Sequence, residues 1–366
     1  MKKGIAKEII CIVPTFYPDL GGVGDYALRL AEKLREKNSI QTHFMVARSS
    51  RKSRYCHDGF PVDILDAVSF GKLADRLPVG NQTVILHYEP YGYEKRGCPR
   101  ELVKALRFWK SKTDEARLIT MFHGLYAFGP PWTSSFWLSY LQQRIVQSLA
   151  NLSNYCLTSN CAMAKALSRF TGRPLDQIVV LPIFSTVGEP HQLTPLTKRF
   201  PRLILFGLRG IRERLYSKKN NILYHMCKKL EVDEVVDIGQ PVDTKCFKMK
   251  GIPIISKGVI GAPEISRLLA ESLAGFACYS SPSSMATSSV FAAFCAHQML
   301  PVVSFYGTFC DRRERDGLRA GRHYWIADDF NRTLDFAHAQ PIAENAHRWY
   351  QMHNRIAHAE AFFKVL

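Results

Sequence analysis

Three closely spaced glycines, Gly21, Gly22 and Gly24, follow an apolar run near the start of the chain. Glycine lets the backbone turn sharply and lets a ligand come close to main-chain N–H groups. A helical pattern begins directly after them, and the N-terminal end of a helix attracts negative charge. The pattern is typical of a site for a phosphate or hydroxyl-rich ligand, or of a tight turn that binds nothing. The spacing does not fit G-x-G-x-x-G, which argues against a nicotinamide dehydrogenase.

Polar side chains stand at the ends of two further apolar runs. His123 ends one of them, and the other ends in His87, Tyr88 and Glu89. A neutral imidazole can hydrogen-bond a sugar hydroxyl, and a tyrosine ring can stack on a sugar. The alternatives are a histidine that only caps a strand and tyrosines that belong to the core. We predict all four as contacts to a hydroxyl-rich ligand.

The second half of the chain offers cations and hydroxyl groups. Arg209 follows an apolar run and a glycine turn, and Arg212, Arg214 and Lys218 come soon after it. Fixed positive groups and backbone dipoles are what a departing diphosphate requires. A later helical pattern begins with a group of hydroxyl side chains, namely Ser283, Ser284, Thr287, Ser288 and Ser289. They predict a second phosphate contact, with ordinary helix capping as the alternative, just as a solvated turn is the alternative for Arg209.

The composition fits a two-domain globular protein with a strongly basic surface. The chain has 366 residues, of which 46% are hydrophobic, and a formal net charge of +17. Such a charge attracts phosphorylated substrates or an anionic membrane face, and no nucleic-acid-binding module accompanies it. The segment 96–112 is basic with an apolar stripe, which suits either a membrane surface or an ordinary surface helix.

Other features narrow the class further. No apolar run is long enough to span a bilayer, and the N-terminal run is too short for a signal peptide, so we expect a cytoplasmic protein. None of the ten cysteines forms a C-x-x-C pair, as expected for reduced thiols. His347, His353 and His358 are spaced six and five residues apart. Two ligands on one helix face need a spacing of three or four, so we predict no metal site. We expect no cofactor either.

Strand and helix patterns alternate through both halves of the chain. Short β-branched runs separated by helical periods are typical of doubly wound parallel sheets. A proline-containing stretch of low apolar content, residues 185–200, reads as a linker. We therefore predict an N-terminal α/β domain over residues 1–187 and a C-terminal α/β domain over 188–340. A final helix over about 341–366 is expected to pack back on the first domain.

The chain resembles the GT-B glycosyltransferases, and within them glycosyltransferase family 4 (group 1). The resemblance is carried by Pro14–Ala27, Thr120–Gly124, Leu203–Arg209, and Tyr279–Ser284 together with Pro301–Val303. Their order and spacing match over nearly the whole chain. The resemblance implies two parallel-sheet domains that face one another across a cleft, with the acceptor bound mainly by the first and a nucleotide sugar mainly by the second.

The resemblance also implies roles for single residues. His123 would position the transferred sugar, and Arg209 would stabilise the diphosphate without a metal ion, although Leu208 separates it from the glycine that it usually follows. The glycines of the first loop would approach the donor phosphates or the acceptor. The acceptor would be contacted by Asp25, Tyr26, His87, Tyr88 and Glu89. An acid in the first turn, such as Asp25, also simply suits the helix dipole. The implied reaction transfers a sugar to a hydroxyl group, with retention of anomeric configuration, in polysaccharide, glycolipid or glycoside synthesis.

The sequence departs from the family at the donor end. The family carries two glutamates eight positions apart before the strand that starts at Pro301, and these positions hold Ala286 and Phe294. Neither side chain can accept a hydrogen bond from a sugar or ribose. Either other residues bind the donor, or the chain is a catalytically degenerate relative. Such a relative would bind a sugar or a nucleotide, or would act as the partner of an active transferase.

Overall fold

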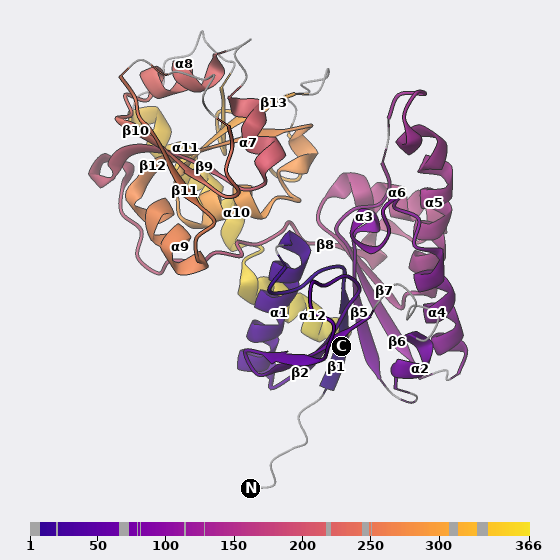
Figure 1. Ribbon diagram of the computed structural model, residues 1–366. Coiled ribbons are helices and arrows are strands. Elements are labelled where there is room, and N and C mark those ends of the chain that lie inside the picture. Colours follow the sequence, from indigo (N-terminus) through magenta and orange to yellow (C-terminus); the bar gives the residue numbers. More distant parts are fainter. Residues whose placement is uncertain are drawn as a thin grey trace, which may run out of the picture. The chain divides into compact units, whose positions relative to one another are not determined.

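The computed structural model describes residues 8–19, 21–65, 73–78, 80, 82–112, 115–127, 129–216, 221–243, 249, 251–306, 314–327 and 336–366. The chain divides into two compact units. Unit 1 comprises Met1–Pro182 and Arg355–Leu366, and unit 2 comprises Ile183–Asn354 (Figure 1). The chain therefore crosses between the units twice, after Pro182 and before Arg355.

Unit 1 is built on an eight-stranded sheet in the order β3-β4-β2-β1-β5-β6-β7-β8. Neighbouring strands are parallel except β3, which pairs antiparallel with β4. The strands are β1 (Glu8–Val13), β2 (Gln41–Val46), β3 (Tyr55–His57), β4 (Phe60–Ile64), β5 (Thr83–Tyr88), β6 (Arg117–Phe122), β7 (Tyr155–Thr158) and β8 (Ile178–Val180). The β3–β4 hairpin is the one part of this sheet that the alternating pattern did not predict.

Both faces of this sheet are buried. In β1, Ile10 and Ile12 belong to one apolar cluster and Cys11 and Val13 to another, so successive side chains enter opposite cores. The helical elements of unit 1 are α1 (Gly22–Asn38), α2 (Leu73–Arg76), α3 (Pro90–Tyr93), α4 (Arg100–Ser111), α5 (Ser134–Leu152), α6 (Cys161–Thr171), the 3-10 turn η2 (Leu175–Gln177) and α12 (Arg355–Val365).

The last helix of the chain completes the first unit. The segment predicted as one helix over about 341–366 is two helices, α11 (Phe336–Gln351) in unit 2 and α12 in unit 1. Helix α12 packs along α1 and buries Ala359 and Phe362. It thereby helps to cover the sheet face that carries Cys11 and Val13, which lie in the same cluster as Ala27, Leu28 and Ala31 of α1.

Unit 2 is built on a six-stranded, fully parallel sheet in the order β11-β10-β9-β12-β13-β14. Its strands are β9 (Phe200–Phe206), β10 (Glu234–Ile238), β11 (Ile254–Gly258), β12 (Ser272–Tyr279), β13 (Leu300–Phe305) and β14 (Trp325–Ile326). Its helical elements, besides α11, are the 3-10 turns η3 (Leu196–Lys198) and η4 (Pro282–Ser284) and the helices α7 (Arg209–Leu215), α8 (Ile222–Lys229), α9 (Ala262–Glu271) and α10 (Ser289–Ala296). Two parallel-sheet α/β units were predicted, and the structure confirms them.

A glycine in the middle of β12 makes room for an aromatic ring from α10. A Cβ atom at Gly275 would lie 2.5 Å from ring carbons of Phe294, closer than real Cβ atoms approach other atoms. Phe294 itself is buried. Because the backbone of β12 and the ring of Phe294 are in contact, α10 lies close against the sheet, and Phe294 serves the core of unit 2.

We expect Gly275→Ala to lower the free energy of unfolding by about 1–3 kcal/mol, because the added methyl group overpacks a filled core. Chemical denaturation of the purified variant measures the effect. Gly210→Ala is the matched control, since a Cβ there meets no atom within 4 Å and the residue lies within α7. It should be neutral or slightly stabilising. Equal effects of the two substitutions would contradict the packing argument.

Candidate functional site

Each sheet has one point at which the strand order reverses. In unit 1 the chain builds outward from β1 through β2 to β4 and returns to the other side of β1 with β5. In unit 2 it builds outward from β9 through β10 to β11 and returns to the other side of β9 with β12. Loops leave such neighbouring strands in opposite directions, and ligands of open α/β sheets bind at the carboxyl ends there. Nearly all the residues predicted from the sequence lie at these two points.

The glycine loop between β1 and α1 is shaped by its own packing. A Cβ atom at Gly21 would overlap the hydroxyl of Thr15, and one at Gly24 would overlap the Thr15 carbonyl oxygen. These two glycines are therefore required by the fold of the loop. At Gly22 a Cβ atom would meet nothing within 4 Å, so this part of the α1 N-terminus is open. Asp25, in the first turn of α1, is exposed beside it.

Two buried groups fix α1 to α12. The Nε2 atom of His358 lies 2.9 Å from the carbonyl oxygen of Pro182, which can only accept, so Nε2 carries the hydrogen. The Nδ1 atom of the neutral ring then accepts a 2.7 Å hydrogen bond from the Tyr26 hydroxyl. Burial lowers the pKa of His358 to about 4. Tyr26 was predicted as an acceptor contact, but this hydroxyl is buried and binds α12.

The two predicted histidines of unit 1 contact one another. His87 Nδ1 lies 3.0 Å from His123 Nε2, and the ring of Tyr26 packs edge-on against both. Burial lowers the pKa of His87 well below its usual range and that of His123 to about 3. Both rings are therefore neutral near pH 7 and act as hydrogen-bonding groups. His123 keeps partial exposure at the end of β6, whereas His87 is fully buried.

Glu89 is the half-buried carboxylate of this edge. It caps the short helix α3, where Oε2 accepts a 2.6 Å hydrogen bond from the Gly92 N–H. Burial raises its pKa, opposed by the main-chain N–H groups of Gly92 and Tyr91. Its other oxygen, Oε1, would lie 3.7 Å from a Cβ atom at Gly124, so the loops after β5 and β6 meet here. The preceding Tyr88 is buried between Tyr93 and Phe122, so its ring belongs to the core.

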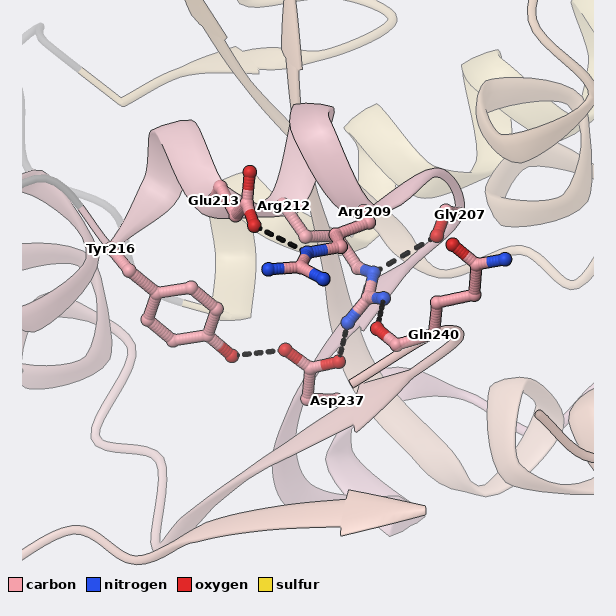
Figure 2. Close-up of polar contacts among 7 residues, drawn as sticks. All are labelled: Gly207, Arg209, Arg212, Glu213, Tyr216, Asp237 and Gln240. Atoms are coloured by element: carbon pink, nitrogen blue, oxygen red, sulfur yellow. Dashed lines mark hydrogen bonds and ion pairs between the residues drawn. The ribbon is translucent and has the colours of Figure 1, made fainter. Parts of the chain in front are cut away.

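In unit 2, Arg212 is buried and makes three interactions, as Figure 2 shows. Its Nε donates to the Gly207 carbonyl at 2.9 Å, and its two terminal nitrogens donate to the Gln240 carbonyl and to Asp237. Tyr216 donates to the other oxygen of Asp237. Arg212 was predicted to bind a donor, but its guanidinium joins the ends of β9 and β10, which is a structural role.

Arg209 and Arg214 are the exposed cations of the same helix. Arg209 is the first residue of α7 and forms a 2.5 Å ion pair with Glu213 on the next turn. Figure 2 shows this pair beside the guanidinium of Arg212. The guanidinium of Arg214 lies 4.0 Å above the ring of Tyr306, which follows β13. Lys218, the fourth predicted cation, lies outside the described residues.

Hydroxyl groups line the chain between β12 and α10. Ser284 Oγ lies 2.9 Å from Ser280 Oγ and 3.0 Å from Ser281 Oγ, and Thr287 donates to the Ser284 carbonyl. Ser288 caps α10 by accepting from the Phe291 N–H at 3.2 Å. Ser283 and Ser289 are half-buried in the same segment. Capping was the alternative interpretation of this group, and the geometry of Ser288 and Thr287 is that of caps and turns.

The positions of the two missing glutamates are both buried. Ala286 precedes α10 and its carbonyl accepts from the Ile183 N–H at 2.8 Å, while Phe294 packs on Gly275. Neither offers a polar side chain to a ligand. Among the described residues, no group of three or more histidine, cysteine, aspartate or glutamate side chains is arranged to hold a metal ion. No helix in the described part of the chain is long and apolar enough to cross a bilayer.

Solved structures of glycosyltransferases resemble this chain over nearly its whole length. An alpha-glucosyltransferase in complex with UDP-glucose and DNA containing an abasic site is 12% identical, with 98% of this chain and 99% of that chain covered and a TM-score of 0.58. A trehalose-6-phosphate protein from E. coli bound with UDP-2-fluoro glucose is 10% identical, with 98% of each chain covered and a TM-score of 0.60.

The alpha,alpha-trehalose 6-phosphate synthase from Burkholderia multivorans is also 10% identical, covers 98% of this chain and 96% of its own, and has a TM-score of 0.58. No protein-family model and no curated protein matches the sequence. The two parallel-sheet units and these neighbours define the fold as GT-B. At such low identity the likeness establishes the fold, and the chemistry rests on the residues described above.

Sequence reasoning overlooked two residues that organise these sites. Asp237 holds Arg212, but it ends an apolar run without any motif around it. His358 was considered only as a metal ligand, although it lies on a terminal helix whose aromatic residues had to be buried somewhere. Neither pairing has a local signal, because the partners lie 25 and 332 residues away.

We expect Arg212→Met to destabilise unit 2 by about 3–5 kcal/mol, because it leaves the Asp237 carboxylate buried without its cation. Arg209→Met should change the free energy of unfolding by less than about 0.5 kcal/mol, since exposed ion pairs contribute little. Urea unfolding of both variants compares the two. A similar loss of stability in each would contradict the distinction between a structural and an exposed arginine.

The free energy of unfolding should fall as the pH drops from about 6.5 toward 4. In that range the unfolded chain protonates His358, whereas the folded chain keeps it neutral, so acid favours unfolding. With a folded pKa of about 4, this residue accounts for on the order of 3 kcal/mol. Denaturation at several pH values should show that the free energy of unfolding depends less on pH in His358→Gln than in the unaltered protein. The part of the pH dependence that comes from His87 and His123 should remain. His191→Gln, at an exposed position, is the control, and an unchanged pH dependence in His358→Gln would contradict the burial argument.

Proposed function

We propose that this protein is a glycosyltransferase that moves a sugar from a nucleotide-diphosphate donor to a hydroxyl group of an acceptor. The observation that carries the proposal is the division of chemistry between the two strand-reversal points. Unit 2 offers exposed cations and hydroxyl groups, and unit 1 offers neutral imidazoles and a carboxylate. A diphosphate requires the first kind of surface, and sugar hydroxyl groups require the second.

For the donor, we propose a UDP-sugar held by unit 2. Arg209 at the start of α7, Arg214 in its last turn, and the hydroxyl groups before α10 are the described groups that we propose for its phosphates. Solved neighbours of the same fold bind UDP-glucose or UDP-2-fluoro glucose, which supports this donor class. Because Ala286 and Phe294 replace the usual glutamates, other groups would have to bind the sugar and ribose hydroxyl groups. We propose main-chain atoms and the serines before α10 for this role.

For the acceptor, we propose unit 1, with Glu89 and Asp25 as the polar contacts and with His123 beside them to position the transferred sugar. His123 is neutral at pH 7, so it would orient a sugar hydroxyl by hydrogen bonding. His87 and Tyr26 lie behind it and hold its ring in place. The open N-terminus of α1 at Gly22 is where main-chain N–H groups would meet a ligand. The acceptor class is a carbohydrate, a lipid-linked sugar or a small hydroxyl compound; with no nucleic-acid-binding module in the sequence, DNA and RNA are not proposed.

We further propose a reaction with retention of configuration and without a metal ion or other cofactor, in the cytoplasm. In a retaining reaction of this kind the departing phosphate assists the incoming hydroxyl, so no strong general base is required. This agrees with the neutral imidazoles of unit 1. The competing proposal is a degenerate relative that binds the donor but does not transfer the sugar. The buried, apolar positions 286 and 294 favour it.

The test combines binding and turnover on the full chain. Titration with UDP-glucose should show saturable binding, and a panel of sugar, lipid-linked and DNA acceptors should yield a glycosylated product. Binding without product over the whole panel would favour the degenerate relative. Absence of binding to UDP-, GDP-, ADP- and dTDP-sugars would overturn both proposals, and a DNA product would overturn the acceptor class.

Arg209→Met should weaken UDP-glucose binding by about tenfold to a hundredfold, because a charge-assisted contact to phosphate is lost. Arg267→Met is a close control, since Arg267 is an exposed arginine of unit 2 that pairs with Glu271 one turn away, as Arg209 pairs with Glu213. It should bind as the unaltered protein does. Isothermal titration measures both, and equal affinities of the two variants would argue against Arg209 as a donor contact.

A further inference from the structure

Four aromatic side chains form an exposed patch on unit 1, which we call the aromatic patch. They are Trp132, in the loop before α5, and Phe136, Trp137 and Tyr140, in its first two turns. Trp132 is 84% exposed, Trp137 73%, Tyr140 71% and Phe136 41%. The opposite face of α5 buries Ser139, Gln142, Ile145 and Val146, so the aromatic residues occupy the side of the helix that normally faces water. Large exposed apolar patches of this kind mark interaction sites.

The aromatic patch is held in place by its own loop. The indole N–H of Trp137 donates to the Pro131 carbonyl at 2.8 Å, and Phe136 packs edge-on against Trp137 with ring centres 5.4 Å apart. Thr133 donates to the Pro130 carbonyl at 2.7 Å. A surface that is ordered before binding loses little entropy when it binds.

An exposed cation flanks the aromatic patch, and the segment that carries the patch contains no acidic residue. Residues 116–175 contain no aspartate or glutamate and five lysine or arginine residues. Arg144 is exposed on α5, one turn beyond Tyr140.

We propose that the aromatic patch docks this protein on an anionic lipid surface. Tryptophan and tyrosine favour the interface between water and hydrocarbon, and flanking cations attract anionic headgroups. The basic segment 96–112, which the sequence suggested for this role, is less suited. Of its apolar residues, α4 buries Leu102, Val103, Leu106 and Trp109 and leaves Phe108 exposed. The surface lies on α5 instead.

The aromatic patch has a defined place in the fold. The loop that carries Trp132 begins at the carboxyl end of β6, directly after His123, and leads into α5 (Figure 1). The surface therefore lies on the same edge of the sheet as the candidate acceptor site. If the glycosyl transfer proposed above holds, docking would present that edge to acceptors in the membrane, although the docking itself needs no donor and no acceptor.

Co-sedimentation of the full chain with lipid vesicles tests the proposal independently of catalysis. The protein should bind vesicles of phosphatidylcholine mixed with phosphatidylglycerol, bind pure phosphatidylcholine much more weakly, and be released by high salt. The double substitution of Trp132→Ser and Trp137→Ser should weaken binding to the anionic vesicles by about tenfold or more. Arg144→Gln should weaken it less, and only for the anionic vesicles.

Phe363→Ser provides the matched control, because Phe363 is an exposed aromatic residue elsewhere on unit 1. It should bind vesicles as the unaltered protein does, and urea unfolding should show that all variants are folded. No binding to anionic vesicles, or equal binding by the double variant, would overturn the proposal. Dimerisation that the double variant abolishes, seen by light scattering without vesicles, would also overturn it, because a second copy would then cover the aromatic patch.

Discussion

The hydrogen bond between Tyr26 and His358 is the interaction on which unit 1 depends. It connects α1, which starts at the glycine loop, to α12, which comes from the other end of the chain. His358 in turn donates to the carbonyl of Pro182, the residue at which the chain leaves the unit. Since burial keeps His358, His123 and His87 uncharged near neutral pH, the whole group can stay in the interior. Protonating an imidazole here would place a charge in the interior, which costs several kcal/mol.

Unit 2 also holds polar side chains in its interior, and there they are charged. Arg212 and Asp237 lie at the ends of β9 and β10. Arg212 donates to Asp237 and to two main-chain carbonyls, and Tyr216 donates to Asp237, so both charged side chains have hydrogen-bond partners. Arg212 is buried by these interactions, whereas Arg209, the first residue of α7, is exposed. The same short segment thus contains one arginine that builds the turn and one that is exposed next to it. The two units offer different chemistry. Unit 1 offers neutral imidazoles and a carboxylate, and unit 2 offers cations and hydroxyl groups.

The sequence was sufficient to predict the strands and helices whose apolar residues recur with a regular period. Buried strands such as β1 and amphipathic helices such as α4 have clear periods, and their alternation predicted the two parallel sheets. It could not distinguish Arg212 from Arg209, since only the distant Asp237 decides which of them is buried. Tyr26, Tyr88 and His87 were predicted as acceptor contacts, with the core as the alternative for the aromatic residues, because the residues that bury them are also distant in the sequence. The β3–β4 hairpin was missed because its strands are three and five residues long, too short for a pattern.

The position of α12 has a consequence for how the protein is made. Synthesis proceeds from the N-terminus, and domains generally fold as they emerge. The first unit, however, lacks the helix that pairs with α1 until residues 355–366 have been translated, after all of the second unit. Its nascent core, with Tyr26 and the imidazoles behind it, must wait with one side uncovered while about half of the polypeptide is added. The ribosome-bound intermediate is therefore a state in which chaperones have something apolar to shield.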